Sequence, residues 1–293
     1  MLSHSSSCPS EAFESGWEQT FSAAVYRCYG SPEVIEIANI RKAEPDDHEV
    51  LVRVKAASVN PLDWHYLRGS PYIMRLESGI GAPDDPHMGV DFAGTVEAVG
   101  TAVSKFAVGD EVFGGRSGAF GEYVLVGESR AIAHKPANIS FAEAAAVPIA
   151  GVTALQAVRD YGRISPGDKV LINGASGGVG TFAVQIAKSL GAEVTGICST
   201  RNVDMVRSIG ADHVIDYTQD DYTEHDVRYD VIVDNVGNHP VTANTGVLED
   251  DGVFVLVGGE KGDWIAPLKG PLKTVLLAPF VDQEMVSILA KLR

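Results

Sequence analysis

NGASGGVG, residues 173–180, places four glycines in eight positions directly after the apolar run KVLI (169–172). Within it, Ala175, Gly177 and Gly180 fit the pattern G-x-G-x-x-G/A, with alanine in the first place. Gly177 lets the backbone approach a pyrophosphate closely, and Gly180 lets the following helix pack against the strand. A tight turn without a ligand is the alternative, but the strand and helix patterns on either side favour a dinucleotide-binding loop.

Helix and strand patterns alternate after this loop. Apolar side chains recur at helical spacing at Val179, Phe182, Ala183, Ile186, Ala187 and Leu190. Further helices are predicted at 202–210 and after Pro240, and strands at 193–198, 213–217, 229–237, 252–259 and 273–280. Such alternation gives a parallel sheet that helices cover on both faces.

The chain before this region has a different pattern, with short β-rich runs between Gly, Pro and Asp turns. Strands are predicted at 23–30, 49–59, 91–100, 110–115 and 121–126. Val50, Val52 and Val54 alternate with Leu51, Arg53 and Lys55, which suits a strand with one buried face. We therefore expect a compact β domain, which the helix-forming segment 141–162 joins to the parallel sheet.

The end of the second predicted strand of the parallel sheet, ICSTRN (197–202), bears on the choice of dinucleotide. NAD sites place Asp or Glu at this point to hold the ribose 2′-hydroxyl, but the first carboxylate here is Asp204, inside the next helix. Ser199, Thr200 and Arg201 can instead donate hydrogen bonds to a 2′-phosphate, and Arg201 matches its charge. This pattern favours NADPH over NADH; a solvated Arg201 at a helix start is the alternative.

The composition excludes several classes of function. A formal charge of −16 and a pI near 4.8 argue against nucleic-acid binding, and no run approaches the length of a membrane span. Cys8, Cys28 and Cys198 lie far apart, which predicts neither a disulfide framework nor a structural zinc site and indicates a cytoplasmic protein. Residues 1–22 lack the features of a secretion signal, and we expect a disordered extension without an assigned function.

The ordered series of motifs resembles the medium-chain dehydrogenase/reductase superfamily, and within it the zinc-independent quinone oxidoreductase (zeta-crystallin-like) branch. The segments that carry the resemblance include VLVRVKAASVNPLDW (50–64), MGVDFAG (88–94), AAAVPIAGVTALQAV (144–158), GDKVLINGASGGVGTFAVQIAK (167–188) and GADHVIDYT (210–218). The resemblance implies an α/β fold with a chaperonin-10-like, β-rich catalytic domain (23–145) and a doubly wound Rossmann domain (146–293). The family's usual C-terminal return into the β domain is expected to be missing, because the chain stops at MVSILAKLR (285–293).

The zinc signature of the related alcohol dehydrogenases is absent. Their Gly-His-Glu motif supplies a zinc-binding histidine, whereas this sequence has Val90 and Asp91 at those two places. Asn60 lies near the place of an earlier cysteine ligand, and the four-cysteine lobe is missing. Zinc needs three or four protein ligands, so we expect a metal-free enzyme.

The resemblance also implies roles for single residues. Asn60 would contact the nicotinamide side, Thr153 the phosphate or ribose, and Tyr217 the 2′-phosphate end. The remaining cofactor-binding residues would come from the glycine loop and from the loops after two sheet strands: Ala175, Ser176, Gly177, Gly178, Val179, Gly180, Asn235, Gly237, Gly258 and Gly259. Asn60 and Tyr66 are the catalytic candidates, with Tyr66 as proton donor; turn chemistry at Asn60 and packing at Tyr66 are the alternatives.

These features predict an NADPH-dependent oxidoreductase that transfers hydride to a quinone or an α,β-unsaturated carbonyl. Such acceptors are already activated, so the reaction needs no Lewis acid. The resemblance further suggests a homodimer formed near KTVLLAPF (273–280). Two alternatives stay open: an NADP-dependent enzyme of the alcohol dehydrogenase type, and a catalytically weak NADPH-binding sensor or interaction protein.

Overall fold

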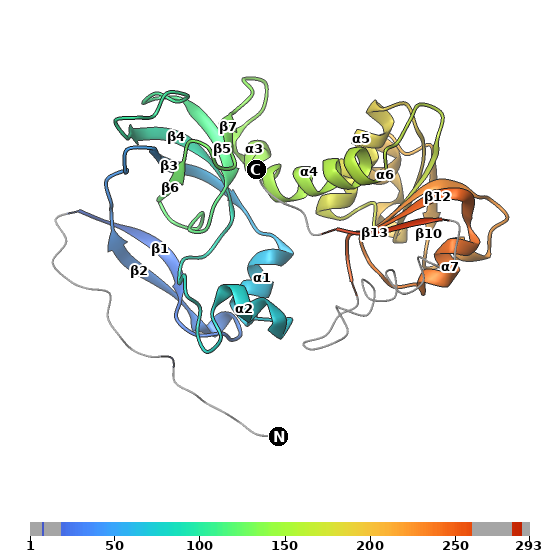
Figure 1. The fold of residues 1–293 in the computed structure, drawn as a ribbon, viewed down its shortest axis with the longest axis horizontal. Helices are drawn as coiled ribbons and strands as arrows, with labels where there is room; N and C mark the ends of the chain where they lie inside the picture. The colour runs from blue at the N-terminus through green and yellow to red at the C-terminus, as the bar shows by residue number, and fades with distance from the viewer. Residues whose placement is uncertain (1–7, 9–18, 260–282, 289–293) are drawn as a thin grey trace. The chain divides into compact units, whose positions relative to one another are not determined.

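The computed structural model describes residues 8, 19–259 and 283–288 (Figure 1). The described chain falls into two compact units, which divide between Ile149 and Ala150. The first unit is built on antiparallel strands and the second on a parallel sheet. This architecture confirms the predicted α/β class with a β-rich domain followed by a Rossmann domain.

The second unit contains a six-stranded parallel sheet in the order β10-β9-β8-β11-β12-β13. Its strands are β8 (Lys169–Asn173), β9 (Glu193–Cys198), β10 (His213–Asp216), β11 (Tyr229–Asp234), β12 (Leu248–Leu256) and β13 (Glu284–Ser287). The helices of this part of the chain are α4 (Pro148–Leu155), which a π-helical turn (Gln156–Tyr161) continues, α5 (Gly178–Ser189), α6 (Val203–Ser208) and α7 (Val241–Gly246).

Consecutive residues of β8 enter separate hydrophobic cores, which explains why this strand is apolar throughout. Val170 and Ile172 pack into a core that includes Ala183 and Val184 of α5. Leu171, between them, packs into a second core that includes α7 and β12. The side chains alternate between the two faces of a strand, so both faces of this sheet are covered.

The first unit contains a five-stranded antiparallel sheet in the order β6-β3-β4-β5-β7 and a separate hairpin, β1-β2. The strands are β1 (Thr20–Tyr26), β2 (Ile35–Arg41), β3 (Glu49–Ser58), β4 (Asp91–Val99), β5 (Glu111–Gly115), β6 (Tyr123–Gly127) and β7 (Ile132–His134). Three helices accompany them: α1 (Pro61–Arg68), α2 (Arg75–Ser78) and α3 (Phe141–Ala145).

One detail of the first unit differs from the strand pattern of the sequence. Leu51 is buried together with Val50 and Val52, so the amino-terminal half of β3 is covered on both faces. Side chains alternate between the two faces of a strand, so Leu51 lies on the face opposite Val50 and Val52 and is buried there as well.

The amino-terminal region also differs from expectation. β1 begins at Thr20 and buries Phe21, so ordered structure starts inside the segment that was expected to be a disordered extension. Cys8 and Cys28 form a disulfide with their Cα atoms 5.6 Å apart. No disulfide framework was predicted from the three scattered cysteines, yet the structure joins this one pair, because a sequence separation of 20 residues says nothing about spatial proximity. Cys198 is buried and free.

At the carboxyl-terminal side, Glu284–Ser287 pairs in parallel with β12 as the sixth strand of the parallel sheet. These residues lie in the stretch where a return to the β domain was expected to begin. The strand predicted at 273–280 lies outside the described residues.

Candidate functional site

Most of the predicted site residues lie at the carboxyl ends of the parallel strands. The strand order reverses between β8 and β11, and open parallel sheets bind ligands at this kind of switch point. Asn173 ends β8, Cys198 ends β9 and Asp234 ends β11. The loops that follow these three residues therefore start side by side at one edge of the sheet.

The glycine loop runs from Gly174, which has a φ of +77°, into the 12-residue helix α5. A Cβ atom on Gly180 would overlap the carbonyl oxygen of Gly174 and press on Ala175, so this position requires glycine for close helix–strand packing. A Cβ atom on Gly177 would meet only the Gly174 oxygen, at 3.4 Å. The Gly177 N–H donates to the Gly174 carbonyl oxygen at 3.0 Å, whereas the exposed Gly178 begins the first turn of α5, whose N–H groups lack an intrahelical acceptor and can bind an anion.

Asn202 connects this loop with the end of β9. Its side-chain nitrogen Nδ2 donates to Oγ of Ser176 at 3.1 Å and to Oγ of Ser199 at 3.2 Å. Both serines are half-buried. Two residues that the sequence analysis assigned to different parts of the cofactor thus lie next to each other.

The other residues predicted for the 2′-phosphate differ from one another in their contacts. The Thr200 hydroxyl donates to Asp216 at 2.6 Å and lies 3.0 Å from the Thr218 hydroxyl, so its hydrogen is already used. The exposed Arg201 side chain forms no hydrogen bond or ion pair within the described part of the chain. Tyr217 is 59 % exposed, and its backbone N–H donates to Cys198, which fixes it beside the end of β9.

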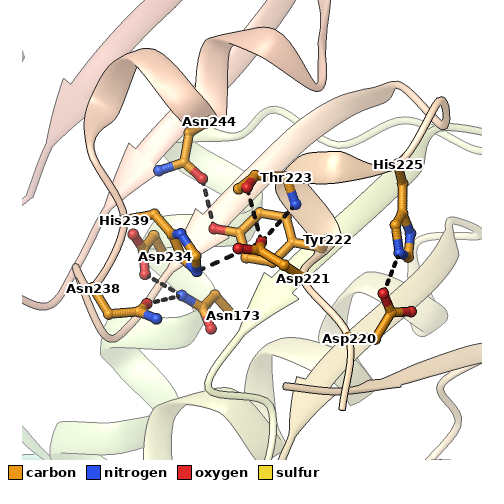
Figure 2. Close-up of polar contacts among 10 residues, drawn as sticks. All are labelled: Asn173, Asp220, Asp221, Tyr222, Thr223, His225, Asp234, Asn238, His239 and Asn244. Atoms are coloured by element: carbon orange, nitrogen blue, oxygen red, sulfur yellow. Dashed lines mark hydrogen bonds and ion pairs between the residues drawn. The ribbon is translucent and has the colours of Figure 1, made fainter. Parts of the chain in front are cut away.

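A buried carboxylate organises the loop after β11 (Figure 2). Oδ1 of Asp234 accepts from Nδ2 of Asn173 at 2.9 Å and from the backbone N–H groups of Val236 and Gly237 at 3.0 and 2.9 Å. Asp234 is fully buried, and its second oxygen, Oδ2, has no partner among the described residues. Asn173 also donates to Asn238, so its amide joins both ends of this loop to β8.

The loop after β12 packs closely on the loop after β11. Gly237 has a φ of +67°, and a Cβ atom on Gly258 would overlap the carbonyl oxygen of Asn235. Asn235 donates to the backbone oxygen of Asn173, while its own side-chain oxygen is buried without a partner among the described residues. Asn235, Gly237, Gly258 and Gly259 therefore lie close together at this edge of the sheet.

Asn60 lies in the first unit, in a second buried polar cluster. Its Nδ2 donates to Asp91 at 3.0 Å and to Ser58 at 3.2 Å, and its backbone N–H donates to Asp63 at 2.7 Å. Asp91 also accepts from the backbone N–H of Ile149. Burial raises the pKa of Asp91 to about 6, although the hydrogen bonds that Asp91 accepts from Ile149, Asn60 and Ser58 oppose the shift. Burial also raises the pKa of Asp63.

The remaining candidates lie on two helices. Tyr66, on α1, is 36 % exposed, and burial of part of the side chain raises its pKa, which keeps the phenol protonated at neutral pH. Thr153, on α4, is nearly buried and belongs to the second unit, as do the predicted residues of the Rossmann sheet. Asn60 and Tyr66 belong to the first unit.

Asn173, Asn202 and Asp234 were not predicted as site residues. Each has a weak sequence signal: Asn173 and Asp234 are polar residues that end apolar strands, and Asn202 closes the STRN stretch. Their role depends on contacts with residues 26 to 65 positions away in the sequence, which residue pattern alone does not reveal.

The described residues show neither a metal-binding cluster nor a membrane-spanning helix. Within residues 8, 19–259 and 283–288, no three His, Cys, Asp or Glu side chains gather where they could bind a metal ion. None of the described helices combines the length and apolar character needed to cross a membrane.

Both halves of the chain match known families. Residues 46–137 match the family described as alcohol dehydrogenase GroES-like domain, and residues 178–276 match the family described as zinc-binding dehydrogenase.

Individual proteins extend this similarity over most of the chain. The chain is 37 % identical to a zinc-type alcohol dehydrogenase-like protein of Schizosaccharomyces pombe, over 82 % of this chain and 73 % of that protein. It is 33 % identical to a chloroplastic NADPH-dependent alkenal/one oxidoreductase of Arabidopsis thaliana, over 89 % and 72 %. The structure of the quinone oxidoreductase from Coxiella burnetii superposes with a TM-score of 0.81 at 27 % identity, over 94 % of this chain and 84 % of that one.

Proposed function

Because this chain belongs to the medium-chain dehydrogenase/reductase superfamily, in its zinc-independent, quinone oxidoreductase-like branch, we propose that it is an NADPH-dependent reductase of quinones or α,β-unsaturated carbonyls. Membership makes the chain an oxidoreductase with a pyridine nucleotide as its cofactor. The preference for the NADP form and the class of acceptor are our proposal.

The glycine loop carries the proposal most directly. Gly178 is exposed in the first turn of the 12-residue helix α5, where helix N–H groups lack an intrahelical acceptor, and Gly180 is held against Gly174. Such a helix start stabilises a pyrophosphate through its free N–H groups and its dipole. The orphaned, buried oxygen of Asn235 at the same edge can accept a hydrogen bond from a ligand. The glycine loop and Asn235 therefore offer groups that can bind a dinucleotide.

The end of β9 supports the NADP form. No carboxylate stands between Cys198 and Asp204, where an NAD site would place one. Asp216, the nearest acidic residue of the neighbouring strand, accepts hydrogen bonds from Thr200, Thr218 and Gln219. Arg201, which is free of partners in the described chain, supplies a positive charge for a 2′-phosphate.

The acceptor class follows from the residues that replace the zinc signature. When bound, NADPH supplies a hydride from its nicotinamide ring, and an activated acceptor takes it up without a Lewis acid. Val90 cannot bind a metal, and the Asp91 carboxylate is committed to Asn60, Ser58 and Ile149. We assign Asn60 to orienting the nicotinamide side of the cofactor, Thr153 to its ribose or phosphate, and Tyr66 to proton donation.

Turnover assays on protein of known metal content test this proposal. The purified protein should oxidise NADPH with quinones or enones, and it should keep this activity after treatment with a chelator. Elemental analysis should find well under one zinc per chain. A stoichiometric zinc, together with chelator-sensitive oxidation of alcohols, would instead identify an enzyme of the alcohol dehydrogenase type.

Two further properties are proposals that need their own tests. A homodimer is expected through residues 273–280, which lie outside the described residues, and light scattering measures the oligomeric mass. A cytoplasmic location is expected from the sparse cysteines, whereas the Cys8–Cys28 disulfide would persist better in an oxidising compartment. Cell fractionation, with titration of free thiols in the isolated protein, tests the location.

A further inference from the structure

The contacts of Asn202 fix the hydrogen-bonding role of two serines at the proposed cofactor site. Ser176 lies in the glycine loop, just before Gly177, and Ser199 directly follows β9. The Asn202 side-chain nitrogen lies 3.1 Å from Oγ of Ser176 and 3.2 Å from Oγ of Ser199. The Asn202 amide therefore joins the glycine loop to the end of β9.

The hydrogen bonds among the Asn202 amide and the Ser176 and Ser199 hydroxyls leave two hydroxyl hydrogens that can still be donated. An amide nitrogen has two hydrogens, and here both are used on serine oxygens. Each serine accepts one of them and keeps its own hydroxyl hydrogen. Neither serine hydroxyl donates to another group within the described part of the chain, and both side chains are only half-buried. Ser176 and Ser199 are therefore set as donors toward a ligand.

We propose that Asn202 is a positioning residue for cofactor selectivity: it holds the Ser176 and Ser199 hydroxyls as a pair of donors for the 2′-phosphate of NADPH. The inference rests on the proposed use of NADPH, and it adds Asn202 as the residue that creates the preference for NADPH over NADH. Both serine oxygens lie within 3.2 Å of one nitrogen, so the two hydroxyls are close enough for one phosphate group to accept from both.

The charges around the pair favour a phosphate monoester over a hydroxyl. A phosphate offers three acceptor oxygens and carries most of two negative charges at neutral pH. Arg201 is adjacent in sequence and has no partner within the described chain, while Thr200 is turned to Asp216 and does not compete. The 2′-hydroxyl of NADH is a single neutral acceptor, so it gains less from two donors and a guanidinium.

Fragments of the cofactor isolate this effect from the nicotinamide. We would titrate the full chain with 2′,5′-ADP and with 5′-AMP, which differ by the 2′-phosphate, using isothermal calorimetry. Wild-type protein should bind 2′,5′-ADP more tightly. Asn202→Ala should lower the affinity for 2′,5′-ADP by about tenfold and the affinity for 5′-AMP by less than about twofold.

Three further variants test whether Asn202 acts through the serines. Ser199→Ala and the double variant Ser199→Ala/Asn202→Ala should show similar losses for 2′,5′-ADP, because residues that act as a unit are not additive. Asn202→Asp keeps the shape but only accepts, so it should also abolish the preference for 2′,5′-ADP. Ser208→Ala, at the other end of α6, is the matched control and should change neither affinity.

A spectroscopic readout separates positioning from a general structural role. Phosphorus NMR of bound 2′,5′-ADP should give a lower 2′-phosphate pKa in wild-type protein than in Asn202→Ala, because aligned donors stabilise the dianion. Equal losses for both fragments in Asn202→Ala, or an additive double variant, would refute the role of Asn202 and leave the NADPH proposal intact. A wild-type protein that binds both fragments equally would refute the NADPH preference itself, and this inference with it.

Discussion

Asn173 donates a 2.9 Å hydrogen bond to Asp234, and these two buried residues end the neighbouring parallel strands β8 and β11. The same Asp234 oxygen accepts from the backbone N–H groups of Val236 and Gly237. A single carboxylate therefore sets the position of the glycine loop relative to the loop after β11. Both loops border the switch point of the sheet, where a dinucleotide is expected.

Asp234→Ala should weaken both the fold and the cofactor site. It leaves three donors without their shared acceptor in a buried site, so the free energy of unfolding should fall by about 3 kcal/mol and NADPH affinity should fall by about tenfold or more. Asp230→Ala, at the opposite end of β11, removes one exposed bond to Lys169 and serves as control. Urea unfolding and NADPH titration measure both effects; equal results for the two variants would contradict the role of Asp234.

Two glycines of the same loop should respond differently to alanine. Gly180→Ala forces a Cβ atom onto the Gly174 carbonyl, so the unfolding free energy should fall by about 2 kcal/mol or more. In Gly177→Ala the new Cβ atom would meet only the Gly174 oxygen, at 3.4 Å, and the φ of −80° is an ordinary one. The fold should therefore keep its stability while NADPH affinity falls. Thermal unfolding and cofactor titration separate the two effects. Unchanged NADPH affinity in Gly177→Ala would argue against a pyrophosphate at this loop.

Arg201→Ala should reduce NADPH affinity by about tenfold or more and NADH affinity by less than about twofold, because we propose that this charge pairs with the 2′-phosphate alone. Arg207→Ala removes another exposed arginine of the same segment, which pairs with Asp204, and is the control. Fluorescence titration with both cofactors measures the difference. If both affinities fall equally, Arg201 does not contact the 2′-phosphate.

Asp91→Asn should change how stability depends on pH. Burial raises the pKa of Asp91 from 3.8 to about 6, with Asp63 as the nearby charge that adds to the shift. The folded state therefore holds the proton more tightly than the unfolded chain, and this contribution to stability is full below pH 3.8 and is lost as the pH rises through about 6.

The loss of its hydrogen bonds shifts the stability of Asp91→Asn by a constant amount. Relative to wild type, its free energy of unfolding should nevertheless rise by about 2.4 kcal/mol between pH 4 and pH 7. Urea unfolding of both proteins at four pH values measures this change. A difference between variant and wild type that stays constant with pH would show that the buried carboxylate has an ordinary pKa.

Local patterns predicted much of the fold. The strand KVLIN (169–173) and the helix after it were predicted correctly. β8 is apolar on both faces, and the apolar residues of α5 recur at helical spacing along one side of the helix. The glycine loop and Ser199 were assigned from residue patterns and Tyr217 from the family resemblance, and all three directly follow strands whose carboxyl ends share one edge of the sheet. These features depend on residues that are close in sequence or on a general rule of sheet topology.

Contacts between distant residues were not predictable in this way. The burial of Leu51 depends on what covers the second face of β3, and the Cys8–Cys28 disulfide joins residues 20 positions apart. Thr200 was grouped with the phosphate donors, but its hydroxyl is held by Asp216 on the next strand. Asn202 was overlooked because its importance comes from the loop that it contacts 26 residues earlier.

The central claim is NADPH-dependent reduction of an activated acceptor, and one steady-state comparison tests it most directly. The kcat/KM values for NADPH and NADH would be measured with a panel of quinones and α,β-unsaturated ketones, using metal-free protein. We expect turnover with at least one acceptor class and a preference of about tenfold or more for NADPH. Tight NADPH binding without turnover of any acceptor, or equal kcat/KM values for the two cofactors, would contradict the account.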